Sequence, residues 1–189
     1  SCPITSVCCG PTSTSTCSDS DGGVSYLTKG SCSSNSGSGT DVCLDVNALR
    51  EYYCTTDKKC GYTTKVCDYG CSSGTCKPKP SCPRGYIAMR VEATAYCLQG
   101  CTAGLQCVHS GTFAVDPAVI KLGCSITIPE LGMSGRAEDT GPAISGKEID
   151  IWMSSCTSAT NFGRKWVNIC TQQTCSALTK QCTTNSDCA

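Results

Sequence analysis

Three short segments, each joining an apolar strand-like run to one aspartate, decide the fold: 111–117 (GTFAVDP), 136–141 (RAEDTG) and 148–151 (EIDI). An aspartate beside glycine or proline is common in turns, so a turn role would be enough to explain Asp116. Asp150 is different, because it lies in mid-strand between two isoleucines, where aspartate is disfavoured. On an alternating strand, Asp150 shares a face with Glu148 and Trp152, opposite the isoleucines.

Further strand-like runs surround these segments throughout residues 83–170. Residues 87–91 (IAMRV) have the period of a half-buried strand. The other runs, separated by turns rich in glycine and proline, are 112–115, 125–128, 135–138, 148–152 and 165–169. One short helix is expected around residues 155–162. Six short strands in a region of this length predict a small all-β barrel.

Cysteine dominates the rest of the chain, with 21 cysteines in 189 residues. This density is typical of a disulfide scaffold in an oxidising compartment. Residues 1–82 hold 12 of the cysteines and little aliphatic content, so disulfides must replace a core there. Residues 83–170 hold six, and residues 171–189 hold three. We therefore predict a disulfide-rich, loop-rich module at 1–82, a barrel at 83–170 and a disulfide-stapled tail at 171–189.

Composition also bounds the partners and the location. The chain starts Ser-Cys-Pro, as a mature form without its signal peptide would, and no apolar run approaches the roughly 18 residues of a membrane span. The net charge is zero and the basic residues do not cluster, which argues against nucleic acid as a partner. With one histidine and no Cys-x-x-Cys pair, zinc sites do not fit. We expect a secreted or cell-surface protein without cofactor or metal.

Serine and threonine are dense in residues 12–16 (TSTST) and 33–40 (SSNSGSGT). These stretches either carry O-linked glycans or are plain solvated loops, and the composition leaves both open. No Asn-x-Ser/Thr acceptor is present, so N-linked glycans are not expected.

The three aspartate segments, in this order and spacing, resemble the three-aspartate (3D) domain. This domain is the catalytic double-psi β-barrel of membrane-bound lytic transglycosylase A and related cell-wall enzymes. The resemblance runs from 91–97 (VEATAYC) through 115–123 (VDPAVIKLG) to 164–169 (RKWVNI). It implies a six-stranded double-psi barrel in residues 83–170.

The resemblance also implies an active site, in which Asp139 takes the acid/base position and Asp116 and Asp150 are its companions. Such an acid protonates the departing glycosidic oxygen and then, as a carboxylate, draws a proton from the 6-hydroxyl of the sugar, which closes a 1,6-anhydro ring. Neighbouring carboxylates would help to keep it protonated. The residues expected to contact the glycan are Thr94, Tyr96, Thr140, Gly141 and Trp152.

The sequence departs from the family pattern after the EDTG segment. The family usually continues with a second glycine and Ala-Ile-Lys-Gly, whereas this chain has Pro142 and Ser145 at the glycine and lysine positions. Proline removes an N–H and fixes φ, and the missing lysine removes a cation near the sugar. These changes bear on turnover rather than on the fold.

Two functions of different classes follow. The first is a secreted enzyme that cleaves peptidoglycan or another polysaccharide. The second is a structural extracellular protein, a disulfide-rich filament or matrix subunit that uses the barrel without turnover and assembles through the Cys-rich module or the tail. A non-catalytic glycan-binding module is the remaining alternative. The odd number of cysteines leaves one without a partner inside the chain, which bears on assembly.

Overall fold

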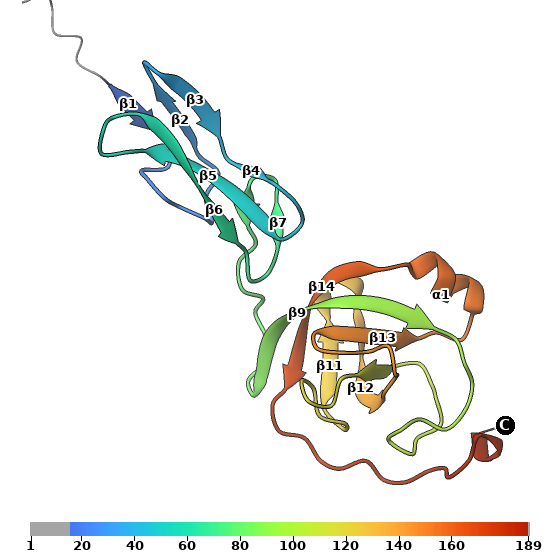
Figure 1. Ribbon diagram of the computed structural model, residues 1–189. Helices are drawn as coiled ribbons and strands as arrows, with labels where there is room; N and C mark the ends of the chain where they lie inside the picture. The colour runs from blue at the N-terminus through green and yellow to red at the C-terminus, as the bar shows by residue number, and fades with distance from the viewer. Residues whose placement is uncertain (1–15, 189) are drawn as a thin grey trace, which may run out of the picture. The chain divides into compact units, whose positions relative to one another are not determined.

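The computed structural model describes residues 16–188 and divides the chain into two compact units, one ending at Lys77 and the other starting at Pro78 (Figure 1). Most of the Ser/Thr stretch at 12–16, together with Cys2, Cys8 and Cys9, lies outside the described residues. Within residues 16–188, no helix has the length and apolar character needed to cross a lipid bilayer.

The first unit consists of short antiparallel strands held together by four disulfides. The strands of its two three-stranded sheets and one hairpin are β1 (Cys17–Asp19), β2 (Ser31–Ser34) and β3 (Gly37–Thr40); β4 (Val42–Cys43), β5 (Ala48–Cys54) and β6 (Cys60–Val66); and β7 (Cys71–Ser72) and β8 (Thr75–Cys76). The bonds are Cys17–Cys54, Cys32–Cys60, Cys43–Cys71 and Cys67–Cys76. The buried cluster contains one aliphatic side chain, Leu49, packed among half-cystines. Disulfides therefore take the place of an apolar core, as predicted.

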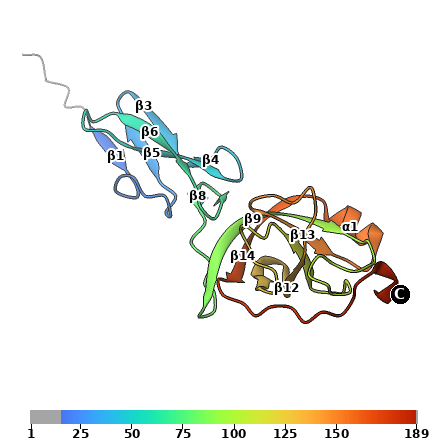
Figure 2. The same ribbon diagram turned by 60° about the horizontal axis from the view of Figure 1, so that its bottom comes forward.

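The second unit is a closed six-stranded barrel, in the strand order β10-β12-β11-β14-β9-β13 (Figures 1 and 2). Its strands are β9 (Tyr86–Tyr96), β10 (Thr112–Val115), β11 (Ser125–Ile128), β12 (Met133–Asp139), β13 (Glu148–Trp152) and β14 (Lys165–Gln172). The β10–β12 and β13–β9 pairs are parallel, and the other four are antiparallel. Each predicted strand is present, which confirms the all-β barrel.

Two short 3₁₀ turns and one helix complete the second unit: η1 (Pro129–Leu131), η2 (Asn185–Cys188) and α1 (Cys156–Phe162). The helix starts where the sequence predicts, because the Ser155 side chain caps it by accepting a hydrogen bond from the Ser158 amide at 3.3 Å.

The barrel core is built by the alternation seen in the sequence. Ile149 and Ile151 of β13 are buried with 0% and 3% exposure, and they pack in the core with Val91, Phe113 and Ile126. Because successive side chains of a strand point to opposite faces, Asp150 is directed away from this core. The alternation therefore places the mid-strand aspartate on the outer face of the barrel.

Five disulfides bond the second unit: Cys82–Cys170, Cys97–Cys156, Cys101–Cys182, Cys107–Cys188 and Cys124–Cys175. The tail is stapled to the barrel unit, as predicted. The six cysteines of 83–170 do not pair among themselves, since one bond of the five, Cys97–Cys156, lies within that group. An even number of cysteines does not determine their pairing. The tail runs along the barrel (Figures 1 and 2), and its three cysteines bond to Cys101, Cys107 and Cys124.

Candidate functional site

The strand register brings two of the three aspartates to the same level of the barrel. Ala114 of β10 is the Cα partner of Asp139 on β12 and also of Asp150 on β13. On the far side of β13, Asp150 pairs with Thr94 of β9. Four neighbouring strands therefore place Thr94, Asp150, Ala114 and Asp139 side by side.

Asp139, at the end of β12, accepts three hydrogen bonds. The Tyr96 hydroxyl donates to Oδ2 at 3.1 Å, and the amides of Ala103 and Thr140 each donate to Oδ1 at 2.9 Å. Burial, together with the negative charge of Asp139, raises the pKa of the Tyr96 phenol far above its ordinary value. Tyr96 therefore keeps its proton and remains a donor to the carboxylate.

Asp150 has a different environment, with a single side-chain donor. The Thr94 hydroxyl donates to its Oδ1 at 2.8 Å. Burial raises the pKa of Asp150 and the negative charge of Asp139 adds to the effect, although hydrogen bonds from Thr94 and the Ile151 amide oppose it. Asp150 therefore keeps a proton to higher pH than an ordinary aspartate does.

Asp116, which follows β10, accepts hydrogen bonds from two backbone amides. Its Oδ1 accepts from the Ala118 amide at 2.9 Å, and its Oδ2 accepts from the Gly146 amide at 2.7 Å. These two bonds lower the pKa of Asp116. The first bond forms an Asx turn, and the second ties the loop between β12 and β13 to the end of β10. The register therefore places Asp139 and Asp150 on the two strands that flank Ala114, whereas Asp116 holds the adjacent loop.

The remaining residues expected to contact a glycan are Trp152, Thr140 and Gly141, and they differ in their exposure and contacts. Trp152 is 9% exposed, and its indole N–H donates to the carbonyl oxygen of Leu98 at 2.9 Å, so the ring supports the loop after β9. Thr140 holds Asp139 through its amide, and Gly141, which follows it, is half-buried.

A pocket of about 200 Å³ opens beside Asp139 and Tyr96. It is lined by Tyr96, Leu98, Gln99, Gly100, Cys101, Val108, Asp139 and Asn185. Asn185 belongs to the tail, and its Oδ1 accepts from the Cys101 amide at 3.0 Å. The sequence indicated neither Asn185 nor the Ala103 amide as part of the site. No local pattern shows that the tail disulfides bring residue 185 to the barrel.

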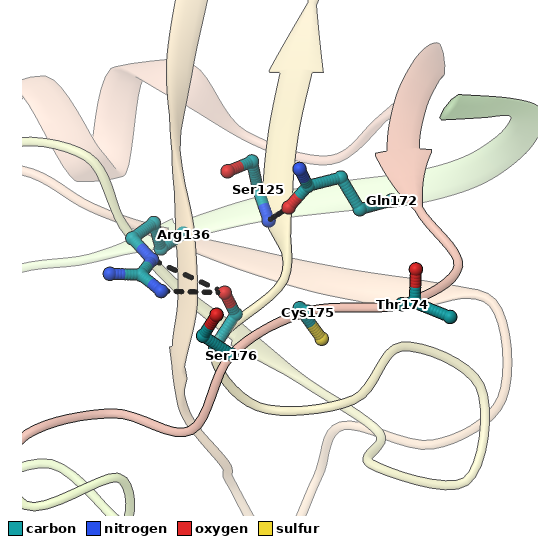
Figure 3. Close-up of a pocket in the computed structure, with 7 residues that line it drawn as sticks. Ser125, Arg136, Gln172, Thr174, Cys175 and Ser176 are labelled. Carbon is teal, nitrogen blue, oxygen red and sulfur yellow. Dashed lines mark hydrogen bonds between the residues drawn. The ribbon is translucent and has the colours of Figure 1, made fainter. Parts of the chain in front are cut away.

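A second, larger pocket of about 490 Å³ is lined by Gly123, Ser125, Arg136, Gln172, Thr174, Cys175 and Ser176 (Figure 3). The Arg136 guanidinium donates to the Gly123 carbonyl from Nε at 3.2 Å and from Nη2 at 2.9 Å. None of the three aspartates lines this pocket. The smaller pocket, which Asp139 lines, is therefore the candidate functional site; Asp150 lies on the neighbouring strand β13 and is not among the residues that line the pocket.

The comparison with protein families finds the 3D domain at residues 111–173. This range holds Asp116, Asp139 and Asp150, whereas Thr94 and Tyr96 are supplied by β9, outside it.

Among curated proteins, the chain is similar to the "Cell wall-binding protein YocH" of Bacillus subtilis (strain 168). The two are 39% identical over 61 residues, which are 32% of this chain and 21% of the relative, so the chain matches about a fifth of that protein's length. The family match, this similarity and the closed six-stranded barrel lead to one conclusion: the second unit of the chain is a 3D-domain double-psi β-barrel.

Proposed function

We propose that the chain acts outside the cell on a cell-wall glycan, and that its barrel cleaves peptidoglycan or a related polysaccharide. The observation that supports this most is the pairing of Asp139 and Asp150 on either side of Ala114, in unlike environments. Two carboxyl groups whose surroundings differ can divide the acid role and the charge-stabilising role between them. The nine disulfides within residues 16–188 fit an extracellular location, and the similarity to a cell wall-binding protein fits the substrate.

The contacts favour Asp150 as the proton carrier. Its raised pKa lets it hold a proton for the departing glycosidic oxygen, which leaves as the bond to the anomeric carbon breaks. The resulting carboxylate then takes the proton of the 6-hydroxyl, whose oxygen bonds to the anomeric carbon and closes a 1,6-anhydro ring without water.

Asp139 is held in one position by three hydrogen-bond donors. Its negative charge would stabilise the positive charge that develops on the sugar ring. The resemblance implies that Asp139 has the acid/base role, whereas the burial that raises the pKa of Asp150 supports our proposal that Asp150 has it, and this difference can be tested.

A non-catalytic wall-binding role is the second candidate. It is favoured by the name of the similar protein and by Pro142 and Ser145, which replace the glycine and lysine of the family pattern. In that case the same pocket would hold the glycan without cleaving it.

The test incubates the purified full chain with peptidoglycan and identifies the released fragments by mass spectrometry. We expect 1,6-anhydro products from the wild type, none from Asp150→Asn, and a weaker yield from Asp139→Asn. Glu130→Gln is the matched control, since Glu130 is an exposed carboxylate of the same unit.

Co-sedimentation with the wall separates the two candidates. Binding without any product would support the non-catalytic role. Neither binding nor product would contradict both, and would leave the structural alternative, which non-reducing electrophoresis and electron microscopy of the native protein would reveal as an ordered polymer.

A further inference from the structure

The first unit contains a cluster of carboxylates that the proposed function does not use. Asp21, Asp41 and Glu51 each place one oxygen within 4.8 Å of the others. Asp21 lies in the loop between β1 and β2, Asp41 lies between β3 and β4, and Glu51 lies in β5. Three separate segments of the chain therefore converge at this cluster.

Glu51 is fully buried, with 0% exposure. It shares the inner face of β5 with Leu49, two residues earlier, so the strand directs a carboxylate to a position where a core residue is expected. Its Oε1 accepts from the Ser25 amide at 2.6 Å, while its Oε2, also buried, has no hydrogen-bond partner among the described residues. A buried carboxylate oxygen without a partner is costly, which indicates that something else satisfies it.

Asp21 and Asp41 complete the cluster. Both carboxylate oxygens of Asp21 are buried and lack a hydrogen-bond partner in the described part of the chain. They lie directly against Gly30, where a Cβ atom would collide with them. Asp41, with 2% exposure, is held in place by the amides of Gly30 and Tyr52. The glycine at position 30 thus leaves room for the Asp21 carboxylate, and two backbone amides fix the position of the Asp41 carboxylate.

Among residues 16–188, no ion pair between a cationic side chain and Asp21, Asp41 or Glu51 is found. The ion pairs found within residues 16–188 involve His109 and Arg164, both in the second unit. Burial raises the pKa of Asp21 and of Glu51, and the nearby carboxylates of Asp19 and Asp41 add to the effect. Such crowding of like charges is relieved when a cation binds among them.

We propose that Asp21, Asp41 and Glu51 bind a hard divalent cation of the calcium class. Carboxylate oxygens are the ligands that calcium prefers, and its flexible coordination allows water and backbone carbonyls to complete the shell. The cluster offers no histidine, and the described cysteines are all in disulfides, so a soft transition metal does not fit.

The cation would tie the loop between β1 and β2 to β5, a cross-link in addition to the disulfides. The sequence contains no sign of this site, because the three carboxylates are far apart in the chain and form no local metal-binding motif. This inference concerns the first unit and is independent of the proposed glycan chemistry.

The test is isothermal titration of the oxidised full chain with calcium chloride in chelator-treated buffer. We expect one site with a dissociation constant on the order of 0.1–1 mM, the range of extracellular calcium modules. Glu51→Gln and Asp21→Asn should each weaken binding at least tenfold. Asp57→Asn, which changes an exposed carboxylate of the same unit, should bind as the wild type does.

Chemical denaturation in the presence of a chelator shows whether each variant is folded. Because Glu51→Gln removes an uncompensated buried charge, we expect it to be at least as stable as the calcium-free wild type, and to gain nothing when calcium is added. The proposal is overturned if the wild type binds no calcium up to 10-fold above this range, or if Glu51→Gln and Asp57→Asn bind it equally well.

Discussion

At the scale of single residues, the site shows how neighbours make two identical side chains unlike. Asp139 faces three donors, one of which is a phenol that keeps its proton. Asp150 receives hydrogen bonds from the Thr94 hydroxyl and the Ile151 amide, and burial, with the charge of Asp139, outweighs them and raises its pKa. The division of roles that we propose follows from this contrast alone.

Asp150→Asn should change how stability depends on pH. Because the folded-state pKa of Asp150 is raised above its ordinary value of 3.8, the protonated side chain favours the folded state. That contribution is complete below pH 3.8 and is lost as the pH rises through the raised pKa. Asparagine cannot ionise, so the variant should gain stability relative to the wild type as the pH rises through this window. Denaturant unfolding from pH 3 to 8 measures it, and a difference independent of pH would refute the assignment.

At the scale of elements, the barrel depends on one close backbone approach. Gly135 of β12 packs directly against the backbone of Gly111, at the start of β10, so that a Cβ atom at residue 135 would collide with the Gly111 carbonyl oxygen. This approach allows β12 to pair with both β10 and β11.

Gly135→Ala should therefore destabilise the barrel by about 3 kcal/mol, since backbone must move to admit the methyl group. Gly132→Ala is the matched control: residue 132 has open space around it but a φ of 63°, so its cost should be only about 1–2 kcal/mol. Urea denaturation of the two variants compares them. Equal costs would mean that the close approach does not limit the fold.

The last turn, η2, is organised by one carboxylate. Oδ2 of Asp187 accepts from the amides of Thr183 and Thr184 at 2.6 and 2.9 Å and from the Thr183 hydroxyl at 2.8 Å. These bonds lower the pKa of Asp187 to about 2. The turn should thus be stabilised above pH 3.8 and should loosen as the pH falls through about 2. An NMR titration of the Asp187 carboxyl would give the midpoint, and a value near 4 would show that the turn does not form.

At the scale of the whole molecule, the sequence predicted the barrel far better than it predicted the first unit. The six barrel strands were readable because aliphatic residues alternate along them, as in Ile149 and Ile151. The strands of the first unit carry few aliphatic side chains, so the alternation of apolar and polar residues along them is weak. The disulfide pairing could not be predicted, because it is set by which strands meet in space. The three aspartates could be picked out because each lies in a recognisable local segment. Asn185 could not, because the tail disulfides bring it to the candidate site.

Removing one tail staple should affect the site as well as stability. We expect the double variant Cys101→Ala/Cys182→Ala to lower the free energy of unfolding of the second unit by about 2–4 kcal/mol. It should also speed hydrogen exchange at Gln181 and Ala103, whose amides bond to Leu105 and Asp139. The matched control, Cys17→Ala/Cys54→Ala, should leave exchange in the second unit unchanged. Hydrogen exchange with mass spectrometry distinguishes the two.

The tail bonds also set an order of events during biosynthesis. The four bonds of the first unit join cysteines between residues 17 and 76, so that unit can oxidise as soon as it has emerged. The barrel must wait, because Cys107 finds its partner only when Cys188 has been made. Until Cys182, Cys188 and Cys175 have been made, Cys101, Cys107 and Cys124 cannot form their native bonds, and their thiolates can attack a disulfide of the chain or of a thiol isomerase. The four bonds between residues 17 and 76 can thus be complete while the disulfides of the barrel remain open to exchange until Cys188 has been made.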